Sequence, residues 1–106
     1  PIRGIANYSM YATGRGAGNA MVKSLSLELA SSKIQVNAIA PNYIENSTYF
    51  PPELTQNEAA MVKMLSNIPS KRLGRPEEVA ELIAFFASDK CGYVTGHVVP
   101  ISGGWA

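Results

Sequence analysis

Apolar residues recur along the chain with spacings that predict three helices. Between residues 10 and 30 they occupy more than one face, so we expect a helix that is covered on two sides. A second helix is expected at residues 54–67. The third begins at Pro76, whose fixed ring suits a first helical turn, and its apolar residues follow the i, i+3, i+4, i+7 spacing. These residues are Val79, Leu82, Ile83 and Phe86.

Two short stretches rich in β-branched and apolar residues predict strands, at residues 34–39 and 97–101. Pro100 lies in the second stretch and cannot donate a ladder hydrogen bond, which indicates the edge of a sheet. Strands that alternate with helices are typical of a parallel sheet in an α/β fold. Two strands are too few for three helices, and the first residue is Pro1, not Met. We therefore expect residues 1–106 to be part of a larger protein.

Composition narrows the classes of function. The net charge is +1 and the basic residues are scattered, so we expect no nucleic-acid partner. No apolar run approaches ~18 residues and no signal sequence opens the chain, so we expect no membrane partner and a cytoplasmic protein. The sequence holds one cysteine, Cys91, and one histidine, His97. They are too few for a disulfide or a protein-only zinc site, so we expect no metal and interpret Cys91 as a small packed thiol.

A tyrosine followed four residues later by an arginine is the candidate for chemistry. On a helix Tyr11 and Arg15 share one face. A cation about 4 Å from a phenol favours the phenolate, which can act as a general base. A surface coincidence is the alternative, because contacts between cations and aromatic rings are common.

Glycines 14, 16 and 18 invite interpretation as a nucleotide-binding loop, which we reject. Such a loop follows a strand and needs G-x-G-x-x-G, whereas Asn19 occupies the position of the third glycine and the preceding residues have a helical pattern. Glu77 and Glu78 follow Pro76 in a first helical turn, where carboxylates stabilise the helix. We interpret them as a helix start rather than a catalytic pair.

A long loop, residues 41–53, follows the first predicted strand and contains Tyr43, Tyr49 and Phe50. In parallel sheets ligands bind beyond the carboxyl ends of the strands, and long loops in compact domains are often functional. We therefore expect this loop to form the mouth of a site. The alternative is an ordinary connection whose aromatic side chains close over the core.

Five separated motifs resemble, in order, the C-terminal half of short-chain dehydrogenases/reductases. They are the Tyr-x-x-x-basic helix and the segments at residues 34–41, 73–80, 93–96 and 103–104. The resemblance implies an α/β fold with a Rossmann-type doubly wound parallel sheet, of which this chain is the C-terminal portion only. Residues 1–106 are then the C-terminal part of a single Rossmann-like domain. The dinucleotide-binding half and the family's catalytic serine would lie upstream of Pro1.

Three positions depart from the usual pattern of that family. Arg15 stands where dehydrogenases have lysine, Asn42 where they usually have glycine, and Ser102 where aspartate is usual. These departures resemble halohydrin dehalogenases, a branch that uses serine, tyrosine and arginine and no nicotinamide cofactor. The resemblance implies that Tyr11 and Arg15 are catalytic, that no cofactor is bound, and that the protein is a homo-oligomer, specifically a homotetramer.

The same resemblance implies the reaction and its pocket. Tyr11 as phenolate removes the hydroxyl proton of a vicinal haloalcohol, the oxygen attacks the neighbouring carbon, and halide leaves to give an epoxide. Arg15 keeps Tyr11 acidic. The expected halide and substrate pocket consists of Pro41, Asn42, Tyr43, Ile44 and Tyr49.

Two alternatives stay open. In an NAD(P)-dependent oxidoreductase of the same superfamily, Arg15 would do the work of the usual lysine, although lysine also binds the cofactor ribose and a guanidinium does not replace an ammonium freely. In a catalytically inactive member, the protein would serve as a binding or assembly subunit. Intact Tyr11 and Arg15 argue against the inactive member.

Overall fold

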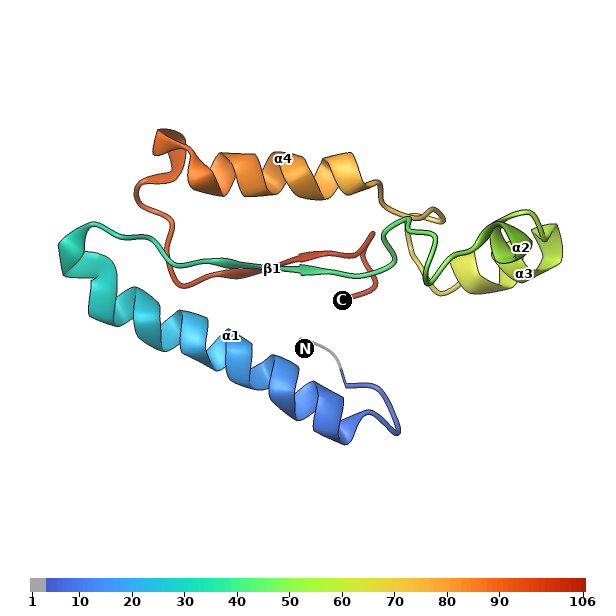
Figure 1. The fold of residues 1–106 in the computed structure, drawn as a ribbon, viewed down its shortest axis with the longest axis horizontal. Helices are drawn as coiled ribbons and strands as arrows, with labels where there is room; N and C mark the ends of the chain where they lie inside the picture. Colours follow the sequence, from blue (N-terminus) through green and yellow to red (C-terminus); the bar gives the residue numbers. More distant parts are fainter. Residues whose placement is uncertain (1–3) are drawn as a thin grey trace.

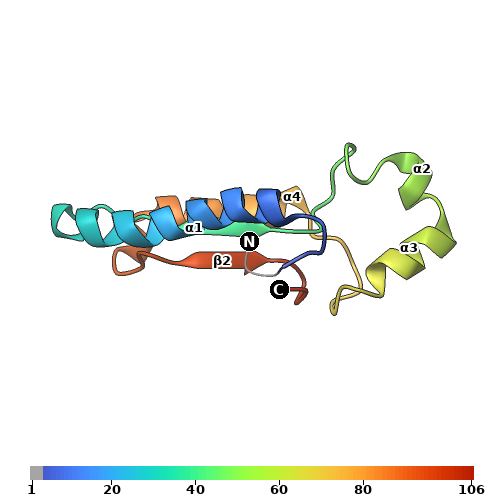
Figure 2. The same cartoon turned by 90° about the horizontal axis from the view of Figure 1, so that it is seen from below.

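A computed structural model describes residues 4–106 and shows a layer of two strands between helices (Figure 1). The helix α1 lies on one face of the strands and α4 on the other, whereas α2 and α3 lie beyond one end of the layer (Figures 1 and 2). The elements are α1 Ser9–Leu29, η1 Ala30–Ser32, β1 Ala38–Pro41, α2 Pro52–Thr55, α3 Glu58–Leu65, α4 Pro76–Ala87, η2 Asp89–Cys91 and β2 Val98–Ile101. This layering confirms the α/β class predicted from the sequence.

The two strands pair in parallel, as predicted. Ala38 pairs with Val98 at the start of the ladder, and Pro41 pairs with Ile101 at its end. Both strands therefore end at the same edge of the layer, where the loop after β1 begins.

The first strand starts four residues later than the sequence pattern predicted. The prediction was residues 34–39, but β1 begins at Ala38. The preceding backbone is engaged by a loop rather than a strand: the Val36 N–H donates to Thr95 Oγ1 at 3.0 Å, and the Val36 carbonyl accepts from the Gly96 N–H at 2.8 Å. A periodicity argument cannot detect a side-chain acceptor that lies 59 residues away.

Asn37 joins this segment to the loop before β2. Its Nδ2 donates to the Val94 carbonyl at 2.8 Å, and its Oδ1 accepts from the His97 N–H at 3.1 Å. The first hydrogen bond of the strand ladder lies next to it: the Ala38 N–H donates to the His97 carbonyl at 2.8 Å. The amide of Asn37 thus satisfies two backbone groups of the other segment and sets the register in which the strands begin.

The single helix predicted at residues 54–67 is wrong, because the structure has α2 and α3 there. Asn57 interrupts the helix with an extended backbone, φ −90° and ψ 101°, and its Oδ1 accepts from the Ala60 N–H at 3.1 Å. Asparagine favours such a cap over a helix interior. After α3, Ile68 is fully buried, with 0% of its surface exposed.

The positions of the other two helices agree with the predictions, whereas the expected cover on two sides of the first helix is not seen among residues 4–106. α1 begins and ends within one residue of the predicted bounds, and α4 begins at Pro76. Among residues 4–106 only one side of α1 is covered, since Val22 is buried whereas Leu27 is 82% exposed. No helix in the described part of the chain is both long and apolar enough to cross a membrane.

Cys91 is buried, as predicted for a packed thiol. Its sulfur lies 3.2 Å from the Phe85 carbonyl and 3.3 Å from the Phe86 carbonyl, both at the end of α4. The thiol therefore closes the turn that follows α4.

Replacing Asn37 by alanine leaves the Val94 carbonyl and the His97 N–H without their partner. We expect Asn37→Ala to lower the free energy of unfolding of the intact protein by about 1–3 kcal/mol. The matched control is Gln35→Ala, which removes one exposed hydrogen bond to the Gly92 carbonyl and should cost less. Denaturant unfolding of both variants measures the difference; equal losses would contradict the register role of Asn37.

Candidate functional site

The structure brings Tyr11 and Arg15 together on the first turns of α1. The guanidinium carbon of Arg15 lies 5.7 Å from the centroid of the Tyr11 ring, a distance typical of cation–π contacts. Tyr8 approaches the same ring edge-on, with centroids 6.1 Å apart. The phenol of Tyr11 is more than half exposed among the described residues, so a reacting group can approach it.

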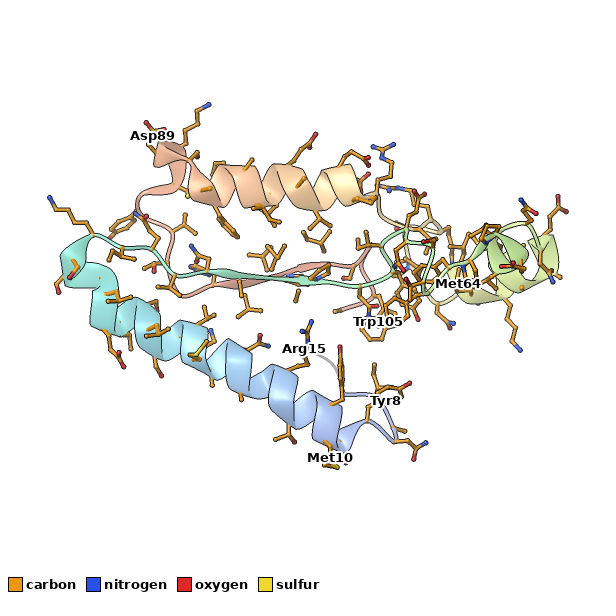
Figure 3. All side chains as sticks on the ribbon, viewed as in Figure 1. Tyr8, Met10, Arg15, Met64, Asp89 and Trp105 are labelled. Atoms are coloured by element: carbon orange, nitrogen blue, oxygen red, sulfur yellow. The ribbon has the colours of Figure 1, made fainter. Side chains whose placement is uncertain are left out.

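This pair lies at the end of the layer where the strands finish. The first turns of α1 and the loop after β1 occupy the same end of the molecule in both ribbon views (Figures 1 and 2). Figure 3 shows Arg15 extending from α1 toward the strands, with Trp105 across from it beside the strand ends. The expected geometry of a parallel sheet, with candidate ligand-binding residues beyond the carboxyl ends, is therefore present.

Internal hydrogen bonds fix the loop after β1. The Asn42 N–H donates to the Ile101 carbonyl at 2.9 Å, and the Tyr43 N–H donates to Asn42 Oδ1 at 2.9 Å. Tyr43 has a left-handed backbone with φ 56°. This conformation is unfavourable for a bulky residue, and such strain persists where the surrounding structure imposes it, often at functional sites.

Two aromatic rings hold the side chain of Tyr43. The Phe50 ring centroid lies 6.4 Å away and that of Trp105 lies 5.7 Å away, the latter edge-on at 74°. Edge-on contacts place the positive rim of one ring against the face of the other. Trp105 was missed from the sequence because nothing in a sequence pattern relates a C-terminal aromatic residue to a loop 62 positions earlier.

A cavity of about 90 Å³ opens beside this loop. It is lined by Asn42, Tyr43, Ile44, Ser70, Arg72, Gly74, Glu78, Ile101, Ser102 and Gly103. Three of the five expected pocket residues, those at positions 42–44, are therefore brought together. Pro41 ends β1 and is exposed, and Tyr49 is 76% exposed with its N–H bonded to Asn46 Oδ1, so neither lines the cavity.

A charged group that the sequence analysis did not assign to the pocket also lines the cavity. Glu78, interpreted as part of a helix start, accepts ion pairs from Arg72 at 3.0 Å and from Arg75 at 3.1 Å. The hydrogen bond and charge of Arg72, together with those of Arg75, hold the pKa of the Glu78 carboxyl below its usual value. The sequence signal for this ion pair was Arg72, six residues before Glu78. That separation does not place two side chains on one face of a helix, so the pair could not be recognised from spacing.

Residues 14–18 lie inside α1, so they form no phosphate-binding loop. Among residues 4–106 there is no group of three side chains that could hold a metal ion. The chemistry that this part of the chain offers is a phenol beside a guanidinium, next to a small polar cavity.

The sequence profile of the family described as Enoyl-(Acyl carrier protein) reductase matches residues 2–106. The chain is 43% identical over 103 residues to the 3-oxoacyl-[acyl-carrier-protein] reductase FabG of Thermotoga maritima, a match that covers 97% of this chain and 40% of the relative. It is 38% identical over 98 residues to the Bacillus subtilis protein named Uncharacterized oxidoreductase YmfI, which covers 91% of this chain and 38% of that one. The chain thus spans about two fifths of these relatives.

Solved structures agree on the fold. A protein described as a dehalogenation enzyme superposes with a TM-score of 0.91 at 52% identity, covering 100% of this chain and 43% of that one. YwfH, described as an NADPH dependent reductase involved in bacilysin biosynthesis, superposes with a TM-score of 0.86 at 31% identity, covering 98% of this chain and 42% of that one. The chain therefore has the C-terminal portion of the Rossmann-like α/β fold.

The lowered pKa of Glu78 predicts a pH dependence. Because the carboxyl is more acidic in the folded state, its ion pairs stabilise the fold above the usual glutamate range, and that stabilisation is lost as the pH falls through the lowered pKa. Glu78→Gln should therefore be less stable than the parent at neutral pH, and the gap should shrink on acidification. Unfolding midpoints between pH 7 and pH 3 measure it, with the exposed Glu77→Gln as control; a pH-independent gap would contradict the assignment.

Proposed function

Because the chain belongs to the short-chain dehydrogenase/reductase superfamily, we propose that the intact protein is a halohydrin dehalogenase, which converts vicinal haloalcohols to epoxides and releases halide. The observation that carries the proposal is the guanidinium of Arg15 against the ring of Tyr11, where the reductases of the family have lysine. The similarity to a solved dehalogenation enzyme, at higher identity than the reductases reported above, supports it.

In the proposed reaction Tyr11 is the base. As phenolate it takes the proton of the substrate hydroxyl; the oxygen then forms a bond to the neighbouring carbon while the carbon–halogen bond breaks and its electron pair leaves with the halide. Arg15 favours the phenolate through its permanent charge. No hydride moves, so the proton, the epoxide and the halide account for every atom of the substrate.

The loop after β1 is the proposed halide pocket. The N–H groups of Asn42 and Tyr43 are bonded within the chain, so they do not donate to a halide. Gly74 forms hydrogen bonds with the Tyr43 carbonyl and the Glu45 N–H, the backbone groups on either side of Ile44. In this parallel bridge the N–H of Ile44 itself points away from Gly74. We assign that N–H, together with the ring of Tyr43, to the large and weakly hydrated halide.

A nicotinamide-dependent reductase is the second candidate, and the names of the relatives favour it. FabG and YwfH are described as reductases, the latter as NADPH dependent, so the expectation that no nicotinamide is bound has no support from them. In this part of the chain Arg15 is the residue that would contact the cofactor, at the lysine position. When bound, a nicotinamide would supply hydride transfer. Residues 14–18 would not bind its phosphates as a glycine-rich loop, because they are helical.

The two candidates are separated by assaying the intact protein for both reactions. We expect halide release from a vicinal haloalcohol without added nicotinamide. Halide electrodes and nicotinamide absorbance are read side by side. Cofactor-dependent absorbance change without halide release would establish the reductase instead.

Tyr11→Phe keeps the ring and its contact with Arg15 but removes the titrating oxygen. We expect halide release to fall by about 10²- to 10⁴-fold, the usual contribution of an acid–base group, with bromide binding largely kept. Tyr8→Phe is the matched control, since Tyr8 contacts the same ring from the N-cap of α1 and should retain activity. Activity of Tyr11→Phe above about a hundredth of the parent would exclude Tyr11 as the base.

Arg15→Lys tests which enzyme the pair serves. In the dehalogenase a mobile, strongly hydrated ammonium replaces a planar guanidinium, so halide release should fall about tenfold or more. In the reductase the same change restores the usual lysine and should preserve or raise nicotinamide-dependent turnover. Both activities of the variant are measured in the intact protein; unchanged halide release would remove Arg15 from the proposed mechanism.

A further inference from the structure

Gly74 is joined to the loop after β1 by a two-sided backbone contact. Its N–H donates to the Tyr43 carbonyl at 2.9 Å, and its carbonyl accepts from the Glu45 N–H at 2.8 Å. The residue between these two, Ile44, pairs with Gly74 as an isolated parallel bridge. The position of the Ile44 backbone is therefore set by Gly74 and not by the β1–β2 ladder, which ends at Pro41.

The absence of a side chain at Gly74 makes room for that of Ile44. A Cβ atom built at position 74 would lie 2.7 Å from Ile44 Cδ1, closer than two carbon atoms approach without one of them moving. Ile44 therefore rests against the bare backbone of Gly74. A methyl group there would push the end of the Ile44 side chain away, and both residues line the same cavity.

Gly74 is itself held by charged side chains on either side of it. Arg72 and Arg75 both reach Glu78 Oε1, at 3.0 and 3.1 Å. Glu78 lies in the first turn of α4, the helix that lies on the other face of the strands from α1 (Figure 1). The ion pairs thus tie the short segment that carries Gly74 to the first turn of α4.

From these contacts we propose that Gly74 is a positioning residue of the halide pocket: its bare backbone seats Ile44, and the ion pairs of Glu78 keep it in register with Tyr43 and Glu45. The inference rests on the proposed function, because it assumes that the loop binds halide. Gly74 does not touch the reacting atoms. Its effect is on how well the loop fits the halide, and so on halide affinity and KM more than on kcat.

A double-mutant cycle in the intact protein tests the contact. Gly74→Ala should raise the inhibition constant of bromide and the KM about two- to threefold, because the methyl group displaces the flexible end of the Ile44 side chain rather than backbone. Ile44→Val removes Cδ1, so the variant with both changes should recover most of that loss. Gly92→Ala is the matched control, because a Cβ there lies 3.7 Å from Gln35 Nε2, an ordinary contact.

The ion pairs are tested separately with a variant that keeps the shape of the side chain. Glu78→Gln should raise the bromide inhibition constant by about two- to fivefold. Glu78→Asp keeps the negative charge, so its inhibition constant should rise less than that of Glu78→Gln. Glu77→Gln should leave it unchanged. If Gly74→Ala does not fold, the double variant and Glu78→Gln decide the question, with Trp105 fluorescence reporting the state of the Tyr43 loop.

The outcomes separate the two proposals. Loss of bromide affinity in Gly74→Ala, relieved by Ile44→Val, supports the positioning role; an unchanged inhibition constant, or a loss that Ile44→Val does not relieve, overturns it. A parent protein that neither binds bromide nor releases halide overturns the proposed function. In that case the positioning role falls with it, whereas a parent protein that binds bromide but shows no coupling between Gly74 and Ile44 overturns the positioning role alone.

Discussion

The parallel pairing of β1 and β2 is the constraint on which the candidate site depends. The ladder joins residues 60 positions apart and places the ends of both strands at one edge, so the loop after β1 and the C-terminal residues meet there. Asn37 sets the register at one end of the ladder, and the bond from Asn42 to Ile101 continues it at the other. A shift of register would move Tyr43 away from Trp105, since each ring belongs to a different strand's continuation.

Much of this architecture could be predicted from the sequence. The long helix, the start of the last helix at Pro76 and the parallel order of strands follow from local periodicity and helix-start residues, which are properties of neighbouring positions. The late start of β1 could not be predicted, because its cause is the side chain of Thr95. The break between α2 and α3 carried a local signal, Asn57, which the apolar pattern around it concealed.

Some residues of the candidate site could likewise be predicted from the sequence, and others could not. Tyr11 and Arg15 could be paired from their spacing alone, because a helix fixes which residues share a face. The cavity could be predicted only in part. Residues 42–44 follow a strand and were expected, whereas Gly74 and Glu78 reach the cavity through contacts between distant segments. The relatives show that one fold serves reductases and a dehalogenation enzyme, so the residues at the site, rather than the fold, must decide between them.

In the proposed enzyme the loop after β1 binds a halide beside Tyr11. Anomalous diffraction from crystals of the intact protein soaked in bromide tests it most directly, because bromide is located by its own scattering. We expect one strong anomalous peak next to the N–H of Ile44 and the ring of Tyr43. Absence of a peak at this loop, in crystals whose protein retains a bound nicotinamide, would contradict the claim.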